Sequence, residues 1–97
     1  MDSEIVCIAN FVAKPNQAQT LQAALEALVA PTRAEAGCLR YQLCRSQDDT
    51  HAFTMVEAFA DEEALAFHRD QPYLDDFKTK VEAMVDAVSV QVYTVIL

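Results

Sequence analysis

The chain has 97 residues and a formal net charge of −8, with 15 acidic residues against 7 Lys and Arg. A surface this acidic repels phosphate backbones and anionic lipid, so we expect neither nucleic acid nor a membrane as partner. Apolar residues make up 53% and no apolar run is long enough to cross a bilayer, which predicts one compact domain over residues 1–97.

The cysteines and histidines limit the chemistry that we expect. Cys7, Cys38 and Cys44 cannot form a closed set of disulfides, and their spacing matches no zinc motif. We interpret them as small apolar residues of a protein in the reducing cytoplasm. The only histidines, His51 and His68, do not form a two-histidine metal motif, and a single glycine cannot supply a phosphate loop. No metal or nucleotide cofactor is predicted.

Residues 4–14 predict a strand, and the residues after them predict a helix. Both faces of the strand are mostly apolar, so we expect both to be covered. Asn16, with Gln19 three residues later, resembles the capping box that opens a helix. The stripe of this helix has helical spacing and consists of Leu21, Ala24, Leu25, Leu28 and Val29.

The end of this helix is followed by a predicted β-hairpin. Pro31 is expected to end or kink the helix, with a last turn running to Glu35, and Gly37 fits the left-handed position that closes a helix. Residues 38–46 and 52–60 alternate as two strands around a polar turn, which is typical of a hairpin. One face of the first of these strands is expected to carry Leu39, Tyr41 and Leu43.

Two helical segments and a last strand complete the chain. Asp61 is the expected N-cap of the first segment, and Pro72 opens the second, which extends to about Ala87. The apolar stripe of the second segment consists of Tyr73, Phe77, Val81, Met84 and Val85. Residues 88–97 are rich in β-branched side chains and predict the final strand.

The element order β-α-β-β-α-β predicts an α+β, ferredoxin-like fold. Its four-stranded antiparallel sheet has helices on one face. The other face would be bare, although every strand has apolar residues on both sides, and an exposed apolar sheet is a liability in a monomer. We therefore predict a homodimer joined sheet to sheet.

The run FTMVEAFADEEALAFH from Phe53 to His68, with EAGCLRY before it, resembles the antibiotic biosynthesis monooxygenase superfamily. The resemblance covers the whole chain and implies a dimeric α/β barrel. The superfamily includes cofactor-independent oxygenases of quinols and phenols, and the isomerase that degrades phosphorylated autoinducer-2. Residues 53–77 are most similar to the isomerase group. Where many members have Thr-Pro-His, this chain has Gln71-Pro72-Tyr73, so it lacks their second histidine.

His68 and Glu57 are the candidate catalytic residues, and both positions match the family pattern. Glu57 interrupts an apolar strand face, and a buried carboxylate calls for a partner. His68 lies on the apolar face of its helix and could act as a general base with Glu57 as its orienter. The bland alternative is a buried His–Glu pair that only holds helix to strand.

Five further residues are candidate substrate ligands. A tyrosine hydroxyl or an amide could contact a substrate oxygen, and an arginine could contact an anionic group; for most of them a structural role is the alternative. These residues are Tyr73, Asn10, Tyr41, Phe77 and Arg40.

Three functions are compatible with these residues. The first is a cofactor-independent monooxygenase of a quinol or phenol that consumes dioxygen in a dry cavity. The second is an isomerase of a small phosphorylated hydroxyketone. The third is a non-catalytic dimeric ligand-binding protein on the same scaffold.

Overall fold

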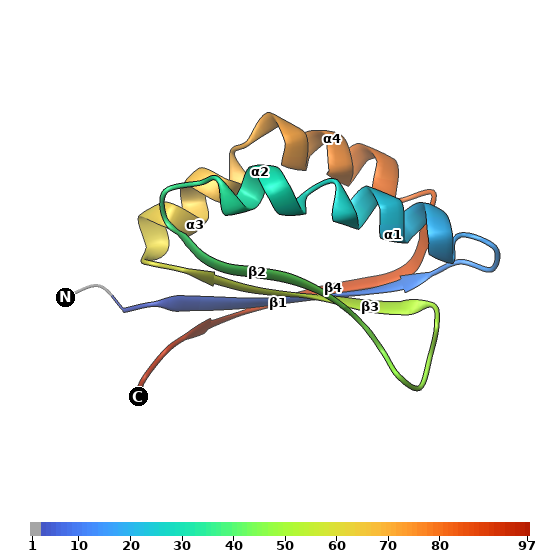
Figure 1. Ribbon diagram of the computed structural model, residues 1–97, viewed down its shortest axis with the longest axis horizontal. Coiled ribbons are helices and arrows are strands. Elements are labelled where there is room, and N and C mark those ends of the chain that lie inside the picture. The colour runs from blue at the N-terminus through green and yellow to red at the C-terminus, as the bar shows by residue number, and fades with distance from the viewer. Residues whose placement is uncertain (1–2) are drawn as a thin grey trace.

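The computed structural model describes residues 3–97 as one sheet with helices on a single face (Figure 1). The strands pair antiparallel in the order β2-β3-β1-β4, which confirms the ferredoxin-like prediction. The elements in chain order are β1 (Ile5–Ala13), α1 (Ala18–Glu26), α2 (Val29–Arg33), β2 (Cys38–Arg45), β3 (Ala52–Phe59), α3 (Glu62–Arg69), α4 (Pro72–Val81) and β4 (Val85–Thr94). None of the helices in residues 3–97 is long and apolar enough to cross a membrane.

The predicted break near Pro31 is confirmed. Helix α1 ends at Glu26 and α2 begins at Val29, with Pro31 inside the shorter helix. Proline has no N–H to donate to the carbonyl four residues earlier, so the regular ladder cannot pass Ala27. The Leu28 N–H instead donates to the Leu25 carbonyl at 3.1 Å, one residue closer than in an α-helix.

The capping box predicted at Asn16 is wrong. Helix α1 has Gln17 at its N-cap, without a side-chain hydrogen bond. Asn16 itself has φ of 67°, the left-handed conformation that asparagine tolerates in turns. The residue is therefore used to turn the chain after β1, one position before the N-cap of α1.

The left-handed conformation predicted for Gly37 is also wrong, because no glycine in the described chain has a positive φ. The glycine is needed for space instead. A Cβ at this position would lie 2.3 Å from the Cβ of Ala64 in α3. The Gly37 carbonyl accepts a hydrogen bond from Ala60 N–H at 2.9 Å, which holds the chain close to the start of α3.

The boundary between α4 and β4 lies earlier than the sequence predicted. Helix α4 ends at Val81, and Val85 already pairs with Ala13 of β1. The Lys14 N–H donates to the Met84 carbonyl at 2.9 Å, so pairing with β1 extends to this point. Strand pairing thus overrides the helical spacing of Val81, Met84 and Val85.

The β2–β3 hairpin is confirmed, but one apolar residue lies on an unexpected side. The pairing shifts between Cys38 and Arg40, which marks a bulge. Leu39 is 57% exposed as a result, whereas Cys38 packs against the core and Tyr41 is buried. The alternation that grouped Leu39 with Tyr41 therefore fails at the bulge.

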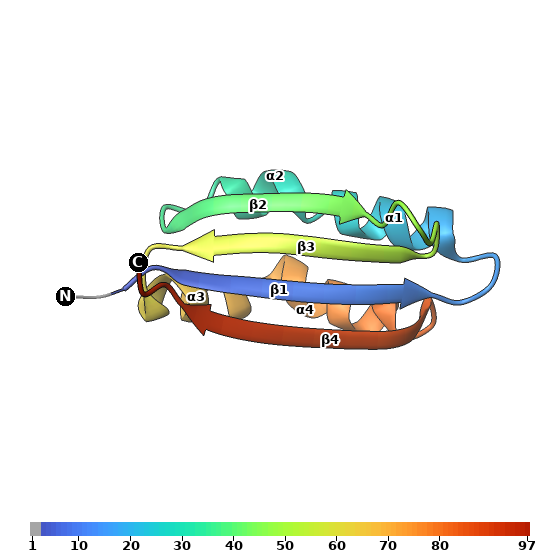
Figure 2. The ribbon, with the colours of Figure 1, turned by 90° about the horizontal axis from the view of Figure 1, so that it is seen from below.

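The core lies between the sheet and the helices, and it fixes which side chains face the site. Figure 2 shows the sheet from its open face, with α1 and α2 behind β2 and with α3 and α4 behind β1 and β4. Residues paired across strands share a face. One such row on the helix side runs across all four strands and consists of Tyr41, Glu57, Cys7 and Val92.

Candidate active site

A cavity of about 340 Å³ lies between the helix side of the sheet and helices α3 and α4. This volume is near the lower end of the range of about 300–1,000 Å³ that is usual for small-molecule sites. Most of its wall is apolar, with side chains that include Ala9, Phe11, Met55, Leu74 and Phe77. Its polar and charged lining residues are Tyr41 of β2, Glu57 of β3, His68 and Arg69 of α3, and Lys78 of α4.

Helix α3 carries His68 into this cavity. The predicted cap is confirmed, because the Asp61 carboxylate accepts a hydrogen bond from Ala64 N–H at 2.8 Å and starts the helix. His68 is 3% exposed, and its ring packs against Phe59 and Tyr41 with centroid distances of 5.0 and 5.6 Å. These two aromatic contacts, one tilted and one edge-on, hold the imidazole ring in place.

The direct hydrogen-bond partner of His68 is Glu35, which was not among the residues predicted for the site. His68 Nδ1 lies 3.0 Å from Glu35 Oε2, and both side chains are buried. The same Glu35 oxygen accepts a hydrogen bond from the Tyr73 hydroxyl of α4. The Thr32 hydroxyl and Glu35 Oε1 are buried beside this cluster without a hydrogen-bond partner among residues 3–97.

A signal for Glu35 was present in the sequence. The buried stripe of α1 continues with helical spacing through α2, and its members are Leu21, Leu25, Leu28, Thr32 and Glu35. A threonine and a carboxylate at the end of an apolar stripe indicate a buried polar cluster. The break at Pro31 concealed this continuation.

Glu57 lies on the other side of the His68 ring. Its Oε1 atom is 3.8 Å from His68 Nε2, which is too long for a hydrogen bond. Burial raises the pKa of Glu57 to about 7; Arg69 lowers this pKa and the nearby Glu35 raises it. Near neutral pH the carboxyl group is therefore divided between its acid and its anion.

The two tyrosines of the site remain protonated near neutral pH. Burial raises the pKa of Tyr73 to about 12, and the hydrogen bond to Glu35 acts in the same direction. Burial also raises the pKa of Tyr41, as does the charge of Glu57. Both phenols can donate hydrogen bonds but cannot serve as bases.

The structure brings some of the predicted site residues together and separates others. Tyr41, Glu57, His68 and Phe77 line the cavity, whereas Tyr73 reaches His68 only through Glu35. The other two predicted ligands, Asn10 and Arg40, lie on the open face of the sheet.

On that face both side chains already have partners. The Asn10 amide oxygen accepts a hydrogen bond from the Thr54 hydroxyl at 2.6 Å. Arg40 Nε donates to the Gln42 amide oxygen at 2.9 Å. Within residues 3–97, no three His, Cys, Asp or Glu side chains gather closely enough to hold a metal ion.

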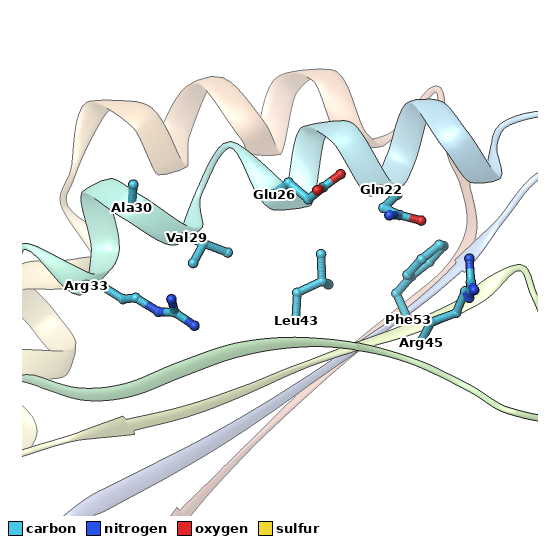
Figure 3. Close-up of a pocket in the computed structure, with 8 residues that line it drawn as sticks. All are labelled: Gln22, Glu26, Val29, Ala30, Arg33, Leu43, Arg45 and Phe53. Atoms are coloured by element: carbon cyan, nitrogen blue, oxygen red, sulfur yellow. The ribbon is translucent and has the colours of Figure 1, made fainter.

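A second, larger depression of about 780 Å³ lies between β2 and helices α1 and α2 (Figure 3). Its lining includes Gln22, Glu26, Arg33 and Arg45. Arg33 Nε donates to the Tyr41 carbonyl at 3.0 Å, which ties α2 to the edge strand. This groove contains no histidine and none of the buried polar cluster, so the smaller cavity is the candidate site.

Residues 4–80 match the family model described as antibiotic biosynthesis monooxygenase. The chain belongs to this family. A Mycobacterium tuberculosis member named "Putative monooxygenase Rv0793" is 34% identical over 93 residues, which is 95% of this chain and 91% of that protein. The family resemblance of the sequence is thereby confirmed, whereas the subgroup within it stays a prediction.

Solved structures of similar proteins have the same architecture along the whole chain. The crystal structure of PA3566 from Pseudomonas aeruginosa superposes with a TM-score of 0.93 at 36% identity, covering 100% of this chain and 98% of that one. SO0527 from Shewanella oneidensis has a TM-score of 0.94 at 34% identity, covering 98% and 93%. Membership of the monooxygenase family supports an enzymatic function with a small-molecule substrate.

Proposed function

We propose that this family member is a cofactor-independent monooxygenase of a quinol or related phenol, with His68 as the general base. One observation carries the proposal. The imidazole is held by Glu35 on Nδ1, while Nε2 has no hydrogen-bond partner among residues 3–97 and faces a mostly apolar cavity that is large enough for an aromatic ring. A histidine fixed on one nitrogen and open on the other suits proton abstraction.

The reaction needs little from the protein beyond this base. His68 Nε2 accepts the phenolic proton, and the phenolate that forms is electron-rich enough to reduce dioxygen, with carbon–oxygen bond formation at the ring. Loss of water from the resulting hydroperoxide leaves a quinone. One dioxygen is consumed, one of its atoms enters the product and the other leaves as water. A dry cavity favours this sequence because water would stabilise the phenolate and intercept reactive oxygen species.

Glu57 and Glu35 have different parts in this scheme. Glu35 is a positioning residue, since its carboxylate fixes the orientation of the His68 ring and favours the imidazolium that forms. Glu57 faces the cavity with a pKa near 7, so its acid form can donate a proton to the departing hydroperoxide oxygen. The gap of 3.8 Å between Glu57 and His68 leaves room for a substrate oxygen to approach both.

The isomerase and binding-protein alternatives receive less support from the site. A phosphorylated substrate would have to bring its reacting carbons to His68, which lies between the carboxyl groups of Glu35 and Glu57, and could place its dianion only beside the exposed Arg69 and Lys78 of the same cavity. A binding protein without chemistry has no need of an imidazole nitrogen left without a protein partner in a mostly apolar cavity. Both remain outcomes of the test below.

We also propose that the protein works as a homodimer in the cytoplasm, joined through the open face of the sheet. This face carries the half-buried side chains of Val6, Ile8, Val12 and Val56. An apolar sheet face of this kind is usually covered. Ile8→Glu should therefore convert a dimer to a monomer in analytical ultracentrifugation, and an unchanged dimer would exclude this face as the interface.

The test of the monooxygenase proposal is oxygen uptake by chelator-treated protein with reduced naphthoquinones. His68→Gln should lower the catalysed rate by about 10²- to 10⁴-fold, the usual contribution of a general base. His51→Gln is the matched control, because His51 lies in the turn before β3 and away from the cavity. Equal uptake by wild type and His68→Gln would show that the oxygen consumption is uncatalysed.

A further inference from the structure

The cavity at His68 extends across the strands of the sheet, and its two ends differ in their lining. Its polar end is formed by Tyr41 of β2 and Glu57 of β3, under His68. From there it passes Cys7 and Ala9 of β1 and reaches Val88 and Val90 of β4. β4 is the edge strand, so this second end lies at the border of the molecule (Figure 2).

This edge is the mouth of the cavity. Val88 and Val90 are on the helix side of β4, yet they are 47% and 53% exposed because no helix fully covers them. Above them the cavity wall is completed by Arg69 at the end of α3 and Lys78 in α4. Both cations are exposed, and neither forms an ion pair within residues 3–97.

Two cations at the mouth of one cavity are unusual in a chain with so few basic residues. The protein has only 7 Lys and Arg residues and a net charge of −8. Two of those seven border one mostly apolar cavity, on two different helices, and Arg69 is close enough to Glu57 to act on its pKa without an ion pair. A cation without a protein partner at the mouth of an apolar site attracts an anionic group of the ligand.

We propose, as a refinement that rests on the proposed function, that the substrate is an aromatic phenol with a carboxylate at its far end. The phenolic hydroxyl meets His68 Nε2 at the inner end, the rings lie along the apolar wall, and the carboxylate remains at the mouth between Arg69 and Lys78. At the inner end a carboxylate would lie beside the Glu57 carboxyl group, whereas at the mouth it meets Arg69 and Lys78. The cavity therefore selects both the charge of its ligand and its orientation.

The test uses two fluorescent probes that differ only at the far end, 2-naphthol and 6-hydroxy-2-naphthoate. Binding to the full-length protein is followed by fluorescence titration without turnover. Exposed charge pairs contribute modestly, so we expect the naphthoate to bind about five- to tenfold more tightly than the naphthol at low salt. Added salt should reduce this preference, because the mouth is solvated.

Substitutions test whether Arg69 and Lys78 cause the preference for the naphthoate. Arg69→Met/Lys78→Met keeps the apolar stems and should abolish the preference for the naphthoate, so that this variant binds the two probes with equal affinity. Arg40→Met/Arg45→Met removes the same charge from β2, the opposite edge strand, and is the matched control that should keep the preference.

Three results would overturn the inference. They are equal affinity of the wild type for both probes, a preference that survives the mouth substitutions, and an equal loss in the control variant, which would assign the effect to net charge. Binding of 2-naphthol without any gain from the carboxylate would refute only the inference, since the proposed oxygenase needs only the phenol. Failure of both probes to bind would refute the ligand class itself.

Discussion

Replacing Glu57 by glutamine removes a buried ionisable group and keeps its shape. In the folded protein burial raises the pKa of Glu57 to about 7, against 4.5 for an unperturbed glutamate. Each pKa unit is worth about 1.4 kcal/mol, so ionised Glu57 destabilises the folded state by about 3 kcal/mol. The unfolded chain ionises first as pH rises. Glu57 therefore lowers stability progressively between about pH 4.5 and 7, and by a constant amount above that.

The measurement is urea unfolding of wild type and Glu57→Gln across this pH range. Other carboxyl groups titrate in both proteins, so the difference in free energy of unfolding isolates Glu57. We expect the two proteins to be nearly equal near pH 4.5 and the variant to be more stable by about 3 kcal/mol above about pH 7. Glu82→Gln on the surface after α4 is a control that should show no such trend. A pH-independent difference would refute the raised pKa and, with it, the acid role of Glu57.

Two other substitutions test the packing and the hydrogen bonds around the site. Gly37→Ala should lower the free energy of unfolding by about 1–3 kcal/mol in urea titration, because the new methyl group overlaps Ala64. Adding Ala64→Gly to this variant should restore part of the lost stability. If the effects of the two substitutions on the free energy of unfolding are purely additive, the residues are not in direct contact. Tyr73→Phe should lower kcat for the quinol about tenfold with little change in KM, since it removes one of the two hydrogen-bond partners of Glu35 Oε2, leaves only His68, and touches no substrate. A change confined to KM would instead place Tyr73 in the cavity.

Much of the architecture could be predicted because it depends on local patterns. The cap at Asp61, the opening of α4 at Pro72, the break around Pro31 and the hairpin all follow from short-range chemistry. The errors occur where distant segments decide. Gly37 is small because Ala64 approaches it, and β4 begins early because Ala13 extends the pairing.

The site residues also differ in whether a local pattern could predict them. The sequence by itself selected His68 and Glu57, because a histidine and a carboxylate on apolar faces are conspicuous and fit the family pattern. It did not select Glu35, whose partners lie 33 and 38 residues away along the chain.

Tertiary structure alone decided which nitrogen of His68 is held and which is open, and which end of the cavity carries Arg69 and Lys78. Helices, strands and their apolar faces depend on the type and spacing of residues that are close together in the chain, so the sequence by itself determined them. The pairing of side chains from α2, α3 and α4 depends on how these helices pack on one sheet. Packing is a property of the whole chain, and no local pattern encodes it.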